Sequence, residues 1–188
     1  MGFQVWRAAW MVVVVAGVVA IAGCGKGLMN SANTKANEAK AQNNIGGIAK
    51  FCIVYAADNG DKGPPSLSYI VKEGGFVRDM LIDPRTGHEP MEISDQGQNG
   101  KELEAAVEAH CDYYYLGNEF KSEQDPEMIM LYDKSNLSVR VVAFGDGHSD
   151  VFAVGSDRLH ETVDACNKAR AKYKLAPLAK DLDGPPPG

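Results

Sequence analysis

The chain has 188 residues, 45% of them hydrophobic, with 25 acidic side chains against 19 Lys and Arg and a formal net charge of -6. This length suits one globular domain. The acidic balance argues against a nucleic-acid-binding protein, which needs a basic surface to neutralise phosphates. Four cysteines are too few for a disulfide scaffold of this size.

An uncharged apolar segment follows the first basic residue, Arg7. Residues 8–23 read AAWMVVVVAGVVAIAG and end directly before Cys24. The run is slightly shorter than the ~17–25 residues that a membrane-spanning helix needs. It is not followed by the basic cluster that would stop translocation of the chain across the membrane. This layout predicts a signal peptide over residues 1–23 that is removed.

The segment ends in a branched aliphatic residue, two small residues and a cysteine: Ile21, Ala22, Gly23 and Cys24. These residues resemble the lipobox of bacterial lipoproteins. The resemblance implies cleavage between Gly23 and Cys24 and attachment of diacylglycerol to the Cys24 thiol. Two or three acyl chains hold a protein on a membrane far longer than one. The expected location is the cell envelope, with the domain facing the periplasm or exterior and with envelope proteins as partners.

Gly2-Phe3 offers another interpretation of the N-terminus, since prepilins are cut after a glycine and their mature chains begin with phenylalanine. Prepilins carry Glu at the fifth mature position, where this chain has Arg7. An uncut signal anchor is a further alternative to the lipoprotein interpretation.

Small and polar residues at 24–34 predict a tether between lipid and domain. Residues 35–58 predict an amphipathic helix because apolar residues recur at spacings of three and four. These residues are Ile45, Ile48, Ala49, Cys52, Tyr55 and Ala56. The pair Gly46-Gly47 inside this helix predicts a kink or a close backbone contact. Ser66 predicts the start of a short helix over 67–73, and another begins near residue 100.

Beyond Cys111 the hydrophobic period changes to two and predicts four short strands. They cover residues 112–116, 128–132, 139–144 and 151–154, and turn residues at 133–136 and 145–148 predict hairpins. Consecutive hairpins make an antiparallel meander. Ser156 predicts the start of a last helix that ends near residue 174, with its buried side formed by Leu159, Val163, Cys166, Ala169 or Arg170, and Tyr173. The Pro- and Gly-rich tail, residues 175–188, is expected to be disordered.

Several stretches between residues 35 and 154 resemble the globular part of type II secretion pseudopilins. More closely, they resemble the prepilin-type, processing-associated proteins recognised by a His, nine residues and Asp-Gly. The matching stretches are residues 44–49, 55–60, 112–117 and 141–148. Asn136 stands at the histidine position, with nine residues between it and Asp146-Gly147.

The resemblance implies a pseudopilin-like α+β fold over residues 35–174. Its long N-terminal helix packs on a small four-stranded antiparallel sheet, with the extra C-terminal helix beyond it. It implies no catalytic residue.

Three polar side chains crowd the second hairpin: Asp146, His148 and Asp150, with Asp133 on the other turn. Pseudopilin sheets often carry calcium in a loop, so this resemblance suggests a calcium site there. Calcium takes six to eight oxygen ligands. The alternative is a solvent-facing turn in which Asp-Gly supplies positive φ.

Two further features have both a functional and a structural interpretation. Cys52 and Cys111 can be paired as a disulfide between the long helix and the first strand, or Cys52, Cys111 and Cys166 can fill the core as small apolar groups. In the run Tyr113-Tyr114-Tyr115, alternate rings point to opposite sheet faces. At least one ring is therefore either a protein-contact residue or covered by a loop or helix, the interpretation we favour.

No nucleophile elbow, Walker loop or dinucleotide fingerprint is present in the sequence. The leading hypothesis is a non-enzymatic, lipid-anchored envelope protein with a pseudopilin-like interaction or structural domain and no cofactor. The first alternative is a pseudopilin-like subunit of a secretion or pilus system that keeps its N-terminal helix. The second is a metal-binding envelope lipoprotein that uses Asp146 and His148.

Overall fold

The computed structural model describes residues 3–73, 78–90, 100–119 and 126–187, and the side chains of residues 31–72, 78–90, 100–118 and 126–187. The chain divides into two compact units, Met1–Asn37 and Glu38–Gly188. The first unit contains the beginning of helix α1 (Phe3–Asp58), and the second contains the rest of α1 and the other described elements. The backbone of residues 25–34 is helical, where the sequence predicts a polar tether.

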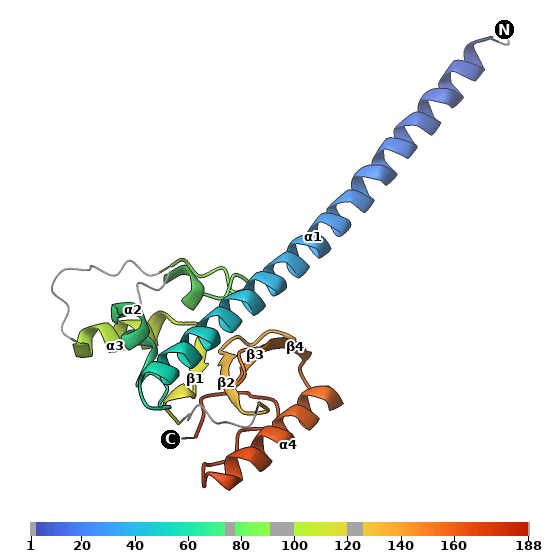
Figure 1. Ribbon diagram of the computed structural model, residues 1–188. Helices are drawn as coiled ribbons and strands as arrows, with labels where there is room; N and C mark the ends of the chain where they lie inside the picture. Colours follow the sequence, from blue (N-terminus) through green and yellow to red (C-terminus); the bar gives the residue numbers. More distant parts are fainter. Residues whose placement is uncertain (1–2, 74–77, 91–99, 120–125, 188) are drawn as a thin grey trace. The chain divides into compact units, whose positions relative to one another are not determined.

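The second unit is α+β, as predicted (Figure 1). Its four strands form one antiparallel sheet in the order β1-β2-β3-β4. The strands are β1 (Tyr113–Tyr115), β2 (Ile129–Asp133), β3 (Val139–Phe144) and β4 (Ser149–Ala153). Short turns join β2 to β3 and β3 to β4, so the predicted meander is confirmed.

Both faces of the sheet are covered. Alternation along β3 sends Val141 and Ala143 into a core shared with the end of α1, and Val142 and Phe144 into a second core shared with α4 (Asp157–Lys172). Figure 1 shows α4 on the side of the sheet opposite the end of α1. This arrangement explains why all five residues of β2 are buried.

At the glycine pair Gly46-Gly47, α1 lies close to neighbouring side chains. The sequence predicted either such a close contact or a kink. A Cβ on Gly46 would lie 2.8 Å from the Ser149 hydroxyl oxygen, and one on Gly47 would lie 2.3 Å from the Cε of Met80. Gln42 adds to this contact, because its Nε2 donates to the Ser149 carbonyl at 2.6 Å. The missing side chains let α1 pack directly against the start of β4.

Two short helices flank the sheet beside α1. They are α2 (Leu67–Glu73) and α3 (Gly100–His110), and 3₁₀ turns occur at η1 (Arg78–Leu81) and η2 (Gly117–Glu119). The Ser66 hydroxyl accepts from the amide of Tyr69 at 3.3 Å, which confirms the predicted start of α2.

The last helix begins as predicted, with the Ser156 hydroxyl accepting from the Leu159 amide. Leu159, Val163 and Cys166 are buried. Tyr173 was expected on the same buried side, but it caps the helix end and its residue is 44% exposed.

Residues 175–187 pack on the second core, so the prediction of a disordered tail is wrong for them. Leu178 and Leu182 are buried in the cluster that also contains Leu159. The Leu178 amide donates to Asn167 Oδ1 at 2.7 Å, and the Tyr132 hydroxyl donates to the Gly184 carbonyl at 2.8 Å. Composition indicated a solvated tail, but burial of these two leucines offsets the cost of ordering it.

Candidate functional site

Two residues of the predicted metal site contact each other, and the third pairs with α4. Asp146 Oδ1 accepts from the backbone amide of His148 at 2.9 Å and contacts Nδ1 of its ring. The imidazole stacks on Phe144, with ring centroids 4.1 Å apart. Asp150 pairs with Arg158 on α4. In the described part of the chain, no three His, Cys, Asp or Glu side chains group as metal ligands, and calcium binding stays a prediction.

Asp133 does not belong to that hairpin. The β2–β3 register pairs Ile129 with Phe144, so Asp133 and the turn after Phe144 lie at opposite ends of the two strands. Asp133 instead accepts from Arg85 Nη2 at 2.9 Å and from the Val141 amide at 2.8 Å. Because this carboxylate is buried and paired, its role is structural.

The cysteines are core residues. No disulfide joins Cys52, Cys111 and Cys166, and all three are buried, so the Cys52–Cys111 pairing is not the arrangement found in this structure. Burial raises the pKa of the Cys52 thiol to about 12 and that of Cys111 to about 11. Both sulfurs find polar neighbours: the Tyr115 side chain for Cys52 and the backbone of Tyr113 for Cys111. Neutral thiols therefore fill these positions, which is the alternative that the sequence left open.

The predicted cleavage and lipidation residues, Gly23 and Cys24, lie outside the residues whose side chains are described, as does Arg7. Within the described residues, no helix is both long and apolar enough to cross a membrane.

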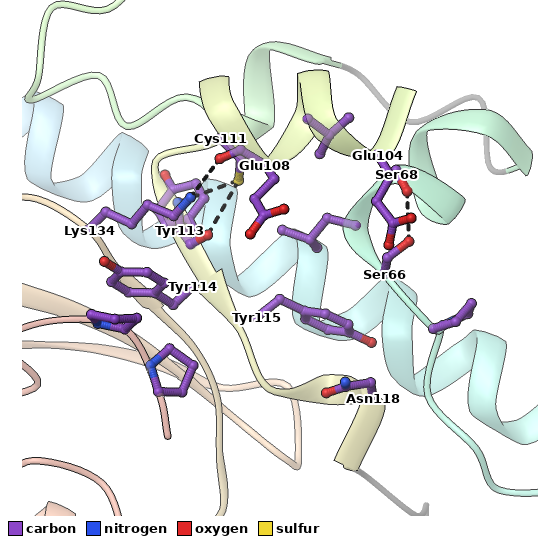
Figure 2. A pocket seen from close by; sticks show the side chains of 15 residues that line it. Ser66, Ser68, Glu104, Glu108, Cys111, Tyr113, Tyr114, Tyr115, Asn118 and Lys134 are labelled. Carbon is purple, nitrogen blue, oxygen red and sulfur yellow. Dashed lines mark hydrogen bonds between the residues drawn. The ribbon is translucent and has the colours of Figure 1, made fainter. Parts of the chain in front are cut away.

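A pocket of about 380 Å³ lies along β1, between α2, α3 and the C-terminal tail. All three tyrosines of β1 line it, together with Leu67 from α2 and Val107 from α3. Figure 2 shows Tyr114 and Tyr115 extending to opposite sides of β1, as alternation along a strand requires. The pocket thus reaches both faces of the sheet at its β1 edge.

Hydrogen bonds hold the tyrosine rings in place. The Tyr115 hydroxyl donates to the Pro64 carbonyl at 2.8 Å, and the Tyr113 hydroxyl donates to the Ile82 carbonyl at 3.5 Å. Burial raises the pKa of both phenols well above the ordinary value. Neither ring is suited to acid–base chemistry near neutral pH, and both act as fixed apolar walls.

Tyr114 lies on the other face and is half-buried. Its ring packs against Tyr132, with centroids 5.2 Å apart, and the ammonium of Lys134 lies 5.3 Å from its centroid. Pro185 and Pro186 of the tail also line this end of the pocket. The ring is partly covered, which agrees with the interpretation favoured from the sequence.

The rim beside α3 is acidic. Glu104 and Glu108 are exposed, lie one helical turn apart and line the pocket. Figure 2 shows the Glu108 carboxylate pointing into it. The nearby Lys134 donates to the backbone carbonyl of Glu108 at 3.0 Å, which keeps this ammonium beside the helix end.

Among the residues that line this pocket, the sequence singled out the tyrosines and Cys111. The spacing of Glu104 and Glu108 was a further usable signal, since it puts both on one helix face. The contribution of the tail could not be inferred from a segment expected to be disordered. An aromatic pocket with an acidic rim can bind a chain segment.

Comparison with known protein families, curated proteins and solved structures finds no match for this chain.

Proposed function

We propose that this chain is a non-enzymatic, lipid-anchored protein of the cell envelope whose pseudopilin-like domain binds other envelope proteins. Anchoring is supported by the apolar segment that ends in Ile21-Ala22-Gly23-Cys24 and by its resemblance to a lipobox. The domain is supported by the helix-and-meander arrangement, which is the one that the pseudopilin resemblance implies.

The pocket along β1 is the observation that carries the binding role. Its walls are tyrosine rings fixed by hydrogen bonds, and aromatic side chains held in this way contribute strongly to protein contacts because little side-chain entropy is lost on binding. Its volume of about 380 Å³ is enough for a few side chains of a partner.

The test of the anchor is the mass of the N-terminal peptide of protein extracted from membranes. We expect a peptide that begins at Cys24 and carries the added mass of acyl chains. A Cys24→Ser variant should lose that mass, whereas Cys111→Ser should keep it, because the Cys111 thiol is buried in the domain. Unmodified Cys24 in the mature chain would contradict the proposal.

The helical backbone of residues 25–34 favours a second candidate. In it, the chain keeps its N-terminal helix and serves as a pseudopilin-like subunit of a secretion or pilus system. The same mass measurement separates the two, since a retained helix leaves Trp6 and Trp10 in the protein.

A further inference from the structure

We propose that the pocket along β1 binds an extended, basic segment of a partner protein, which adds to the sheet as a strand beside β1. This inference rests on the proposed binding role and names the chemistry of the partner. Three features of the pocket carry it: the edge of β1 that faces away from β2, the side-chain walls on both faces, and the two carboxylates on the rim.

The first feature is the edge of β1 that faces away from β2. Among the strands that the structure describes, β1 is at the end of the sheet order and pairs with β2. The Lys134 amide donates to the Asp112 carbonyl at 2.7 Å, and the Leu116 amide donates to the Met130 carbonyl at 2.8 Å. Because backbone groups in an antiparallel strand alternate in direction, those of Tyr113 and Tyr115 face away from β2.

The Cys111 thiol occupies part of this edge. Its sulfur lies 3.4 Å from the amide nitrogen of Tyr113 and 3.6 Å from its carbonyl oxygen. A thiol is a weak donor and a weak acceptor. A peptide backbone would therefore replace two weak interactions with two amide hydrogen bonds.

The second feature is a wall for each side of an added strand. Successive side chains of an extended peptide point to opposite faces. On one face, Leu67, Val107 and Tyr115 belong to the first core, and on the other the Tyr114 ring packs against the second core. These four residues and two tail prolines line the pocket. A peptide that pairs with β1 would thus place alternate residues against each wall, which is the mode of strand addition.

The third feature selects a basic partner. Glu104 and Glu108 line the pocket from α3, and within the described residues neither carboxylate makes an ion pair. The described lining thus has two carboxylates and one ammonium, that of Lys134. A lysine or arginine of the added strand beside Glu104 and Glu108 would be attracted, whereas an acidic residue there would be repelled.

The experiment uses the full-length chain in detergent and two fluorescein-labelled peptides. One has the sequence Thr-Val-Lys-Val-Lys-Val-Thr, and the other carries glutamate in place of both lysines. By fluorescence anisotropy, the lysine peptide should bind at least about tenfold more tightly. Equal affinity for the two peptides would contradict the basic preference.

Two variants locate the site. Glu104→Gln with Glu108→Gln should weaken binding of the lysine peptide about tenfold. The matched control, Glu161→Gln with Asp164→Asn, removes the same charge from exposed positions of α4 and should leave affinity unchanged. Unchanged affinity in the first variant, with an unaltered circular dichroism spectrum, would overturn the assignment to this pocket.

Backbone chemistry tests strand addition itself. Methylating the amide nitrogens on one edge of the lysine peptide removes the donors that pair with β1 and should cost about tenfold in affinity, whereas methylation of the other edge should not. Binding should also slow amide hydrogen exchange at Tyr113 and Tyr115. If neither methylated edge matters, the peptide does not pair with β1.

The lipid anchor and the peptide-binding site are tested by independent measurements, so one proposal can be contradicted while the other holds. Loss of the acyl mass would leave the peptide affinities as they are, and absence of peptide binding would leave the acylated Cys24 peptide in the mass spectrum.

Discussion

The carboxylate of Asp133 at the end of β2 accepts a hydrogen bond from the guanidinium of Arg85 at 2.9 Å, and both side chains are almost fully buried. The two residues are 48 positions apart in the chain. Arg85 also binds Asp83, with its Nε 2.9 Å from Oδ1. One guanidinium therefore holds two buried carboxylates beneath the β2–β3 turn.

We expect Arg85→Met to destabilise the protein by about 3–5 kcal/mol, because it leaves two buried carboxylates without their shared partner. Burial already raises the pKa of Asp133, so its ionised form has little solvent to replace the lost guanidinium. Urea unfolding of the two proteins measures the difference. Arg158→Gln breaks the exposed pair with Asp150 and should cost less than about 1 kcal/mol. Equal effects of the two changes would contradict a structural role for Arg85.

Substitution of Gly46 should reveal the tight contact of α1 with β4. A Cβ at this position would lie 2.8 Å from the Ser149 Oγ, which is held by donating to the Gln42 carbonyl at 3.0 Å. We expect Gly46→Ala to lower the free energy of unfolding by about 1–3 kcal/mol, even though alanine favours a helix. Gly100→Ala is the control, since a Cβ there meets no atom within 4 Å. A Gly46→Ala protein that unfolds at the same urea concentration as the parent would show that the contact is loose.

The buried thiols should react only after unfolding. Reagents attack the thiolate, and burial raises the pKa of Cys52 to about 12 and that of Cys111 to about 11. At pH 8, a thiol-specific chromogenic reagent should therefore label Cys52, Cys111 and Cys166 slowly in the folded protein and fully in urea. Absence of Cys52 and Cys111 labelling in urea without a reductant would instead indicate a disulfide between them.

The packed tail should contribute to stability. Leu182 is 1% exposed in the second core, and removing a buried leucine side chain costs about 2–5 kcal/mol. We expect Leu182→Ala to show a loss in this range by urea unfolding, whereas Lys180→Ala, at an exposed position, should show almost none. A neutral Leu182→Ala would restore the prediction of disorder for this segment.

We expect acid to destabilise the packing of the tail, residues 175–187. A hydrogen bond from His160, 2.8 Å away, lowers the pKa of Asp181. A carboxyl whose pKa is lower in the folded state contributes stability above its unfolded pKa of about 3.9, and that contribution is lost as the pH falls through the folded value. The protection factors of the amides in residues 175–187, which compare the observed exchange rate with the intrinsic rate at each pH, should therefore fall below about pH 4. In Asp181→Asn this fall should disappear.

Local patterns were sufficient for most of the secondary structure. The spacing of Ile45, Ile48 and Cys52 identified the buried face of α1, and Ser66 and Ser156 marked the starts of two helices. These signals succeed because caps and periodicity involve residues within a few positions of one another. Alternation along a strand likewise predicted that the tyrosine rings of β1 point to opposite faces of the sheet.

The sequence by itself determined the order of the elements and the two hairpins that join β2 to β3 and β3 to β4, because a short turn brings consecutive strands side by side. Only the tertiary structure decided that Arg85 joins Asp83 to Asp133, that Cys52 and Cys111 fill the core without pairing, and that Leu182 closes the second core. It also assembled the acidic rim, the tyrosines and the tail prolines into one pocket. These outcomes depend on side chains that are distant in the chain and meet only when α1 and α4 cover opposite faces of the sheet.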